Sequence, residues 1–199
     1  HTLGIAPYVE RVIAFEPDID NFYVLTANCS AAGLSNVSPT RLALGDLMSD
    51  GTTQFDYGKT TVTSGNDFKI APVDMLGIPR IDFMKIDVEG SELKVLYGAR
   101  STLANAKPDL LIEMQDESKY TSVYQYLKSF GYNIFWFPVG TFSPTNHNNV
   151  EENIFGENHG VINWVATVQD IQTTLEPIVD ENDTVERMVR RRSEKNGIA

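Results

Sequence analysis

The chain has 199 residues, a formal net charge of −11 at pH 7, 42% hydrophobic residues and 22% charged residues, which is typical of a soluble globular protein with one sizeable core. The negative charge argues against a nucleic-acid partner, and no apolar run is long enough to span a membrane. The single cysteine, Cys29, excludes a disulfide framework and a cysteine-based zinc site. We expect Cys29 to pack as a small core residue. We also expect the protein to be cytoplasmic.

The first elements alternate between strand and helix. Residues 11–16, "RVIAFE", form a short apolar run that predicts a strand, and a helical pattern follows until Gly33, a good helix stop. Residues 36–44 predict a second strand, which ends at Gly45 and Asp46. The next segment, 47–69, is rich in Gly, Thr, Ser and Asp, so we expect a long loop that could hold a hairpin.

The alternation continues through the second half of the chain. Strand 81–88 precedes a helix for which Ser91 is a plausible N-cap. A buried strand, a helical period and two final strands follow, over residues 108–114, 117–130, 132–138 and 161–168. The two tryptophans, Trp136 and Trp164, fall within these last strands, and we expect them in the core.

This pattern predicts an α/β fold in which helices cover both faces of a mostly parallel sheet. The early strands are nearly continuous apolar runs, as parallel strands buried on both faces are. The last two strands lack a helix between them, so we expect an antiparallel edge at the C-terminal end. Beyond residue 170 the hydrophobic pattern weakens, and residues 170–199 predict a C-terminal extension, either a helix or a tail.

Acidic residues follow several of the predicted strands. Glu16, Asp87 and Glu113 each end one, and Asp46 lies just beyond another. In open α/β sheets, ligands bind outside the carboxyl ends of the strands. Glu16 could accept both hydroxyls of a ribose, because its two oxygens match a vicinal diol. A helix-capping acid is the alternative, but Asp18 is better placed to cap.

The stretch "KIDVEGSE" concentrates charge at the end of one strand. Gly90 permits a tight exit into the helix, and Glu89 and Glu92 could serve only as partners of the helix dipole. Asp87 is harder to explain, since an acid at the end of a core strand costs desolvation unless it is paired or bound. Lys85 could supply that pairing, and a salt bridge alone is the better explanation of the lysine.

Together these residues resemble the FkbM-type methyltransferase family, whose members depend on S-adenosylmethionine and have a Rossmann-like sheet. The resemblance covers roughly residues 2–168 and includes the helix that carries Asn28. It lies in "VIAFEPD" (12–18), "LALGD" (42–46), "VDML" (73–76), "FMKIDVEGSELKVLYGA" (83–99) and "KPDLLIEM" (107–114). The order of the last two stretches is its most specific part.

The resemblance implies an O-methyltransferase that acts on a hydroxyl of a sugar or small metabolite. It implies that cofactor-binding residues hold the ribose and lie along the adenine of S-adenosylmethionine, with Asp46 as a partner of the adenine amino group. These residues are Glu16, Pro17, Leu44, Gly45 and Asp46. It also implies that Asp87, Glu89 and Glu113 face the methyl donor and the acceptor as catalytic residues.

The resemblance has a further consequence for the start of the chain. In this superfamily a glycine-rich loop after the first strand holds the methionine part of the cofactor. That strand and loop would precede "HTLGIAPYV", so they are missing from these residues. We therefore expect residues 1–169 to form a methyltransferase domain that is N-terminally incomplete, with residues 170–199 as its extension.

A divalent metal is a minority hypothesis for the same acids. Asp87 and Glu113, on neighbouring strand ends, would suit a hard cation such as Mg²⁺, which could acidify the acceptor hydroxyl and orient it. His147 and His159 lie in the long loop 139–160. Either could act as a general base over the acceptor, although an exposed loop histidine explains each of them better.

Two other functions stay open. A NAD-dependent oxidoreductase would share Glu16 and the sheet, and Tyr124 and Lys128 have the spacing of short-chain dehydrogenases, although Tyr124 falls on the apolar stripe of its helix. A non-catalytic scaffold or glycan-binding module could also retain the fold. A homo-oligomer could form through an edge strand or through residues 170–199. The acceptor, a small molecule or a glycan, cannot be identified from the sequence.

Overall fold

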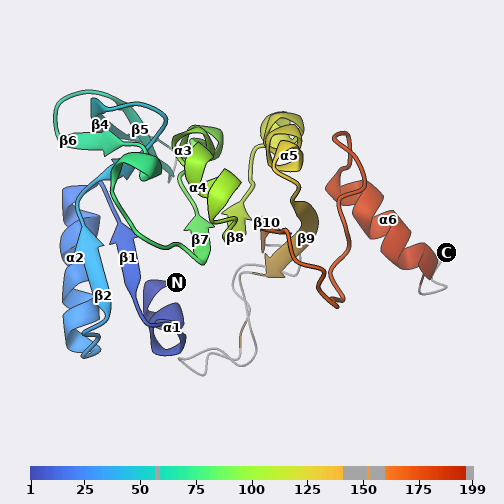
Figure 1. Cartoon of the computed structure of the whole chain (residues 1–199), viewed down its shortest axis with the longest axis horizontal. Helices are drawn as coiled ribbons and strands as arrows, with labels where there is room; N and C mark the ends of the chain where they lie inside the picture. The colour runs from blue at the N-terminus through green and yellow to red at the C-terminus, as the bar shows by residue number, and fades with distance from the viewer. Residues whose placement is uncertain (57–58, 141–151, 153–159, 196–199) are drawn as a thin grey trace. The chain divides into compact units, whose positions relative to one another are not determined.

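The chain divides into two units, residues 1–78 with 94–100 and residues 79–93 with 101–199. The structure is a computed structural model that describes residues 1–56, 59–140, 152 and 160–195, and Figure 1 shows its elements in chain order. In the described part of the chain, no helix is both long enough and apolar enough to cross a bilayer.

The first unit opens with two short helices, α1 (Thr2–Ile5) and the 3-10 helix η1 (Ala6–Tyr8), and continues with β1 (Val12–Phe15), α2 (Ile19–Ala31) and β2 (Val37–Thr40). Strands β1 and β2 pair in parallel, with Val12 opposite Val37. Helix α2 begins after Asp18, whose side chain accepts hydrogen bonds from the backbone N–H groups of Asp20 and Asn21. Asp18 is thus the helix cap that the sequence predicted.

A second sheet completes this unit. It contains β3 (Ala43–Leu44), β4 (Ser49–Asp56), β5 (Lys59–Ser64) and β6 (Phe68–Ala71), in the order β3-β6-β4-β5, and the 3-10 helix η2 (Val73–Met75) follows. Strands β4 and β5 are antiparallel neighbours, so the predicted hairpin within residues 47–69 is confirmed. Cys29 is 4% exposed and unpaired, which confirms that it packs in the core of this unit.

The second unit is built on a four-stranded sheet. Its strands are β7 (Phe83–Ile86), β8 (Asp109–Glu113), β9 (Asn133–Gly140) and β10 (Gly160–Thr167), in the order β7-β8-β10-β9. The helices between and after them are α3 (Glu92–Gly98), α4 (Arg100–Asn105), η3 (Glu117–Lys119), α5 (Tyr120–Ser129) and α6 (Val185–Lys195). Residues 94–100, in α3 and α4, belong to the first unit.

The fold is mixed α/β, as predicted, and the antiparallel arrangement at its C-terminal end is confirmed by the pairing of β10 with both β8 and β9. The sheets are nevertheless less parallel than we predicted. Among the described residues, three strand pairs are parallel and four are antiparallel. The difference arises because residues 47–69 join a sheet as a hairpin instead of remaining a loop.

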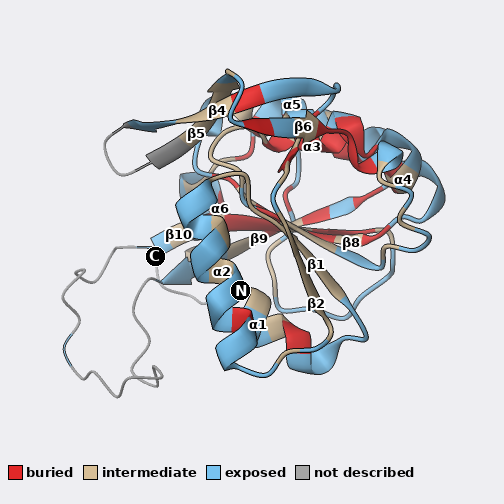
Figure 2. Ribbon diagram, turned by 90° about the vertical axis from the view of Figure 1, so that its left-hand side faces the viewer, coloured by how far each residue is buried: buried red, intermediate tan, exposed pale blue. Residues whose placement is uncertain are grey.

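Aromatic side chains form the core of the second unit. Trp136 and Trp164 are each 1% exposed, which confirms their predicted place, and their rings meet edge to face at a centroid distance of 5.8 Å. The ring of Tyr120, from α5, lies 5.0 Å from that of Trp164 and 5.6 Å from that of Trp136. Figure 2 marks such buried residues in red along the strands and the helices.

The segment that leads to α6 packs against β9. The backbone N–H of Trp136 donates to the carbonyl of Glu176 at 2.8 Å, and the N–H of Ile178 donates to the carbonyl of Ile134 at 2.8 Å. Met188, on α6, is 3% exposed. Although the hydrophobic pattern of the sequence weakens here, this part of the chain contributes backbone pairing and an apolar side chain to the second unit.

Candidate functional site

Glu16 stands directly after β1, where the parallel pair β1/β2 ends. Its Oε1 accepts a hydrogen bond from the backbone N–H of Asp18 at 2.9 Å, so one oxygen helps to fix the start of α2. Among the described residues, no hydrogen bond to Glu16 Oε2 is found. Burial raises the pKa of Glu16, the N–H of Asp18 lowers it in part, and the neighbouring Asp18 carboxylate raises it. The side chain thus combines a structural contact with one oxygen that could take a ligand.

The neighbouring residues of the predicted cofactor site are also placed in the first unit. Pro17 is half-buried between Glu16 and the cap of α2. Leu44 ends β3 and is half-buried, whereas Asp46 is exposed. Between them, the N–H of Gly45 donates to the carbonyl of Ala71 at 3.1 Å, which holds the Leu44–Asp46 segment beside β6.

Gly98 explains a further part of the sequence motif. A Cβ at this position would fall on the carbonyl oxygen of Gly45, and it would lie 3.0 Å from the Cα of Pro72. Only glycine leaves room for such a close approach of two backbones. The glycine in "LYGA" is therefore required for packing against the Leu44–Asp46 segment.

The acids of the second unit gather around a lysine. Strands β7 and β8 are parallel neighbours with Ile86 opposite Ile112, so Asp87 and Glu113 emerge side by side. Lys85 Nζ lies 3.2 Å from Asp87 Oδ2 and 3.7 Å from Glu113 Oε2. The side chains of Lys85 and Glu113 are each 12% exposed and that of Asp87 is 35% exposed. Of the two acids, Asp87 is the more accessible to a substrate.

The other oxygen of Glu113 is also engaged. Glu113 Oε1 accepts a hydrogen bond from the side-chain amide of Gln115. Lys85 Nζ, in addition to its two ion pairs, lies 3.5 Å from the carbonyl oxygen of Ile86. The expected pairing of Lys85 with Asp87 is therefore present, and it extends to Glu113.

Glu89 lies on a tight turn that follows Asp87. The N–H of Ser91 donates to the carbonyl of Val88 at 3.2 Å, and the two residues between them have positive φ angles, 45° at Glu89 and 95° at Gly90. A left-handed conformation is ordinary for glycine but costs free energy at a glutamate. The turn therefore needs support from its surroundings.

Two side chains provide that support. Glu92 Oε1 accepts a hydrogen bond from the N–H of Gly90 at 2.7 Å, and Glu92 is 5% exposed, so it is a buried acceptor within the motif. Lys119 Nζ donates to the carbonyl of Gly90 at 2.6 Å and pairs with Asp116 at 3.4 Å. The turn after β7 is thereby linked to the segment after β8.

The metal hypothesis does not fit this arrangement. In the described ranges no group of three or more His, Cys, Asp or Glu side chains is placed to hold a metal ion. Lys85 Nζ lies within ion-pair distance of both Asp87 and Glu113, and Mg²⁺ demands a nearly ideal octahedron of oxygens. The structure therefore gives no support to Mg²⁺ at these two carboxylates.

Sequence reasoning missed three residues of this site, Gln115, Asp116 and Lys119. A local signal exists for Asp116 only, because its carboxylate accepts hydrogen bonds from the backbone and the hydroxyl of Ser118, a turn pattern that Asp-x-Ser favours. The contact of Lys119 with Gly90 has no sequence signal. His147 and His159, considered as general bases, lie outside the described residues.

A comparison with protein families gives one match. The model of the methyltransferase FkbM domain matches residues 6–134, well over half of the chain. The chain therefore belongs to the FkbM methyltransferase domain family. No curated protein matches the chain.

Two solved structures resemble the chain. The first, methyltransferase FkbM from Methylobacillus flagellatus KT, has a TM-score of 0.54 and 20% identity over 78% of this chain and 36% of that one. This chain thus spans about a third of the length of that protein, and at this identity the likeness shows the fold alone. The second, precorrin 8w decarboxylase from Methanobacterium thermoautotrophicum, has a TM-score of 0.48 and 17% identity over 83% and 74%, too weak a likeness to bear on the reaction.

Proposed function

We propose that the chain is a methyltransferase that depends on S-adenosylmethionine and methylates a hydroxyl group of a sugar or small metabolite, with a Rossmann-like domain over residues 1–169. The observation that carries this proposal is the FkbM match over residues 6–134. That range contains every residue that we assign to the site, from Glu16 to Glu113.

We assign cofactor binding to residues of the first unit. The carboxylate of Glu16 is half-buried and fits a ribose diol, because Oε2 is available and Oε1, which accepts the N–H of Asp18, has a second lone pair for a hydroxyl. Asp46 presents an exposed carboxylate that can accept hydrogen bonds from the adenine amino group. Leu44 and Gly45 place that carboxylate, because Gly45 is fixed by Ala71 and by the close approach of Gly98.

We assign the treatment of the acceptor to residues of the second unit. When bound, S-adenosylmethionine supplies an electrophilic methyl group for a hydroxyl oxygen, and that oxygen must lose its proton as the new C–O bond forms. Asp87 suits acceptance of this proton because it is the most exposed member of the cluster. A positioned general base contributes about 10²–10⁴-fold to such a rate.

The remaining two acids take different roles. Glu113 is nearly buried and held by both Lys85 and Gln115, so it acts on Asp87 through the lysine. Glu89 projects from the turn whose φ of 45° is maintained by its neighbours. We assign to Glu89 contact with the acceptor, because a costly backbone conformation at the end of a strand is typical of functional sites.

Calorimetry with S-adenosylhomocysteine on the full-length protein tests the proposal. We expect Glu16→Gln to weaken binding about tenfold or more, because a hydrogen bond to a charged group contributes roughly 1.5–3 kcal/mol. Asp20→Asn, an exposed acid in the first turn of α2, is the matched control and should leave binding within twofold. Since the pKa of Glu16 is raised by burial, affinity should fall as the pH drops through that raised value.

The outcomes separate the alternatives. If the wild-type protein binds NAD and no S-adenosylhomocysteine, the methyltransferase proposal is wrong and the oxidoreductase takes its place. If neither ligand binds, a scaffold is the better description. If the wild-type protein and Glu16→Gln bind S-adenosylhomocysteine equally well, the function stands and the assignment of Glu16 to the ribose fails.

A further inference from the structure

Lys85 lies where a cation shared by two acids would lie. Its ammonium group is within 3.2 Å of Asp87 and 3.7 Å of Glu113, and its side chain is only 12% exposed. The carbonyl of Ile86 approaches the same nitrogen at 3.5 Å. Oxygens from three residues and two neighbouring strands therefore surround one positive charge.

The charge of Lys85 has an electrostatic purpose. Asp87 and Glu113 follow adjacent strands of a parallel pair, so their two negative charges repel each other. A positive charge within ion-pair distance of both offsets this repulsion. A divalent metal bridging two carboxylates would serve the same end.

We propose that Lys85 is the resident cation of this acidic cluster and takes the place of a divalent metal, so that the chain's reaction needs none. In this inference Lys85 is a positioning residue that holds Asp87 toward the acceptor, while Glu113, which itself accepts a hydrogen bond from Gln115, pairs with the lysine. The catalytic part of the inference rests on the proposed methyl transfer. The statement about the cation does not, because it concerns only the three side chains.

Lys85→Met tests the inference directly. This change keeps an unbranched side chain as far as Cε and removes the ammonium group, so that the two adjacent carboxylates lose the cation that pairs with both of them. We expect calorimetric titration with Mn²⁺ to reveal one binding site per chain in Lys85→Met and none in the wild-type protein. The added substitution Asp87→Asn should abolish the new site, because one remaining carboxylate does not suffice.

A matched control separates this effect from the loss of any lysine. Lys69 forms an ion pair with Asp50 at the surface of the first unit, with side chains 70% and 42% exposed. Lys69→Met therefore frees a single carboxylate, and we expect it to gain no Mn²⁺ site. Lys85→Arg keeps the positive charge and should also gain none.

Turnover provides a second test. We expect the wild-type rate to be unchanged in EDTA. Lys85→Met should lose at least tenfold in kcat while its affinity for S-adenosylhomocysteine stays within twofold, and added Mg²⁺ should restore part of that loss. Lys85→Arg should retain most of the rate. A merely structural ion pair predicts neither a new metal site nor recovery by a metal.

Several results would overturn the inference. It fails if the wild-type protein binds Mn²⁺ at Asp87, or if EDTA removes wild-type turnover and Mg²⁺ restores it. It also fails if Lys85→Met folds but neither binds Mn²⁺ nor loses activity. If Lys85→Met does not fold, the wild-type titration and Lys85→Arg decide the question. If no ligand of the proposed function binds, the Mn²⁺ titrations still test the role of Lys85.

Discussion

Asp183 should be a sensitive position for the stability of the second unit. Its side chain is completely buried and accepts five hydrogen bonds. Arg191 donates to both carboxylate oxygens at 2.7 Å each, and Trp136 Nε1 donates to Oδ2 at 3.1 Å. The backbone N–H groups of Val179 and Thr184 donate at 3.3 and 3.1 Å. This carboxylate thus connects Trp136 on β9 and Val179, in the segment before α6, with Arg191 on α6.

The substitution Asp183→Asn allows the magnitude to be worked out. One oxygen becomes an NH₂ group, which faces donors instead of accepting from them. The loss is smaller if the NH₂ group replaces Oδ1, which accepts two of the five hydrogen bonds. At roughly 1.5 kcal/mol for each hydrogen bond to a charged group, the loss in the free energy of unfolding is then about 3 kcal/mol. Breaking a buried ion pair costs about 3–5 kcal/mol in general, which agrees with this figure.

The pH dependence has a definite sign. Burial raises the pKa of Asp183, but the hydrogen bonds from Arg191, Trp136 and Val179 together outweigh it, and the net pKa is lowered. A lowered pKa stabilises the folded state above the unfolded value of an aspartate, about 3.9, and this stabilisation is lost as the pH falls through the folded pKa. The difference between the wild-type protein and Asp183→Asn should therefore be full at neutral pH and shrink in acid.

Urea unfolding followed by tryptophan fluorescence measures this effect. The chain has two tryptophans, and both are buried in the second unit, so the signal reports on that unit. Asp180→Asn is the matched control, because Asp180 pairs with Arg187 at 3.9 Å and the two side chains are 53% and 58% exposed. It should cost less than about 1 kcal/mol. If Asp183→Asn costs no more than the control, the buried network does not stabilise the unit.

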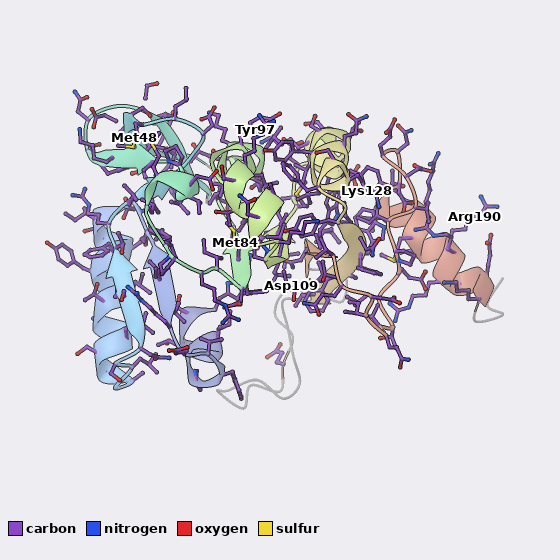
Figure 3. The ribbon with its side chains drawn as sticks, in the orientation of Figure 1. Met48, Met84, Tyr97, Asp109, Lys128 and Arg190 are labelled. Atoms are coloured by element: carbon purple, nitrogen blue, oxygen red, sulfur yellow. The ribbon has the colours of Figure 1, made fainter. Side chains whose placement is uncertain are left out.

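Two further substitutions test the support of the site. Gly98→Ala should destabilise the protein by about 1–3 kcal/mol and weaken S-adenosylhomocysteine binding, because the new Cβ would displace the carbonyl of Gly45. Thermal unfolding and calorimetry measure the two effects. Gly4→Ala is the control and should change neither, because no heavy atom lies within 4 Å of the Cβ that it adds. Lys119→Met should lower kcat more than it changes KM in steady-state kinetics, because the strained turn after β7 loses the hydrogen bond from Lys119 to the carbonyl of Gly90. Lys128→Met is the control, at an exposed position of α5 (Figure 3), and should leave both constants unchanged.

The features that could be predicted from the sequence are those fixed by local pattern. Apolar runs indicated several of the strands, although the single strand predicted over residues 36–44 is in fact two, β2 and β3, which belong to different sheets. The lack of a helical pattern in the sequence between the last two predicted strands indicated the antiparallel pairing of β9 and β10. The cap at Asp18 and the burial of both tryptophans followed from residue type and position. In each case neighbouring residues in the sequence decide the outcome.

Features that depend on distant residues could not be predicted. Lys119 and Gly90 are 29 residues apart, and their hydrogen bond exists only because β7 and β8 are neighbours. The requirement for glycine at Gly98 likewise arises from the carbonyl of Gly45. The packing of the residues near the C-terminus could not be predicted either, because their hydrophobic pattern is weak. The buried ion pair of Asp183 with Arg191 helps to hold them in place, and a hydropathy pattern does not reveal an ion pair.

The charges of "KIDVEGSE" can now be divided by what each of them contacts. Glu92 is buried and accepts the N–H of Gly90, so its work is to hold the turn. Lys85 faces two acids, and only Asp87 among the three keeps substantial exposure. A sequence motif of this family thus mixes residues that shape the backbone with residues that could meet a substrate. A match to the motif therefore does not by itself assign catalysis to its acids. The contacts of each side chain do distinguish them: we expect substitution of Asp87 to reduce turnover, and we expect substitution of Glu92 to impair folding.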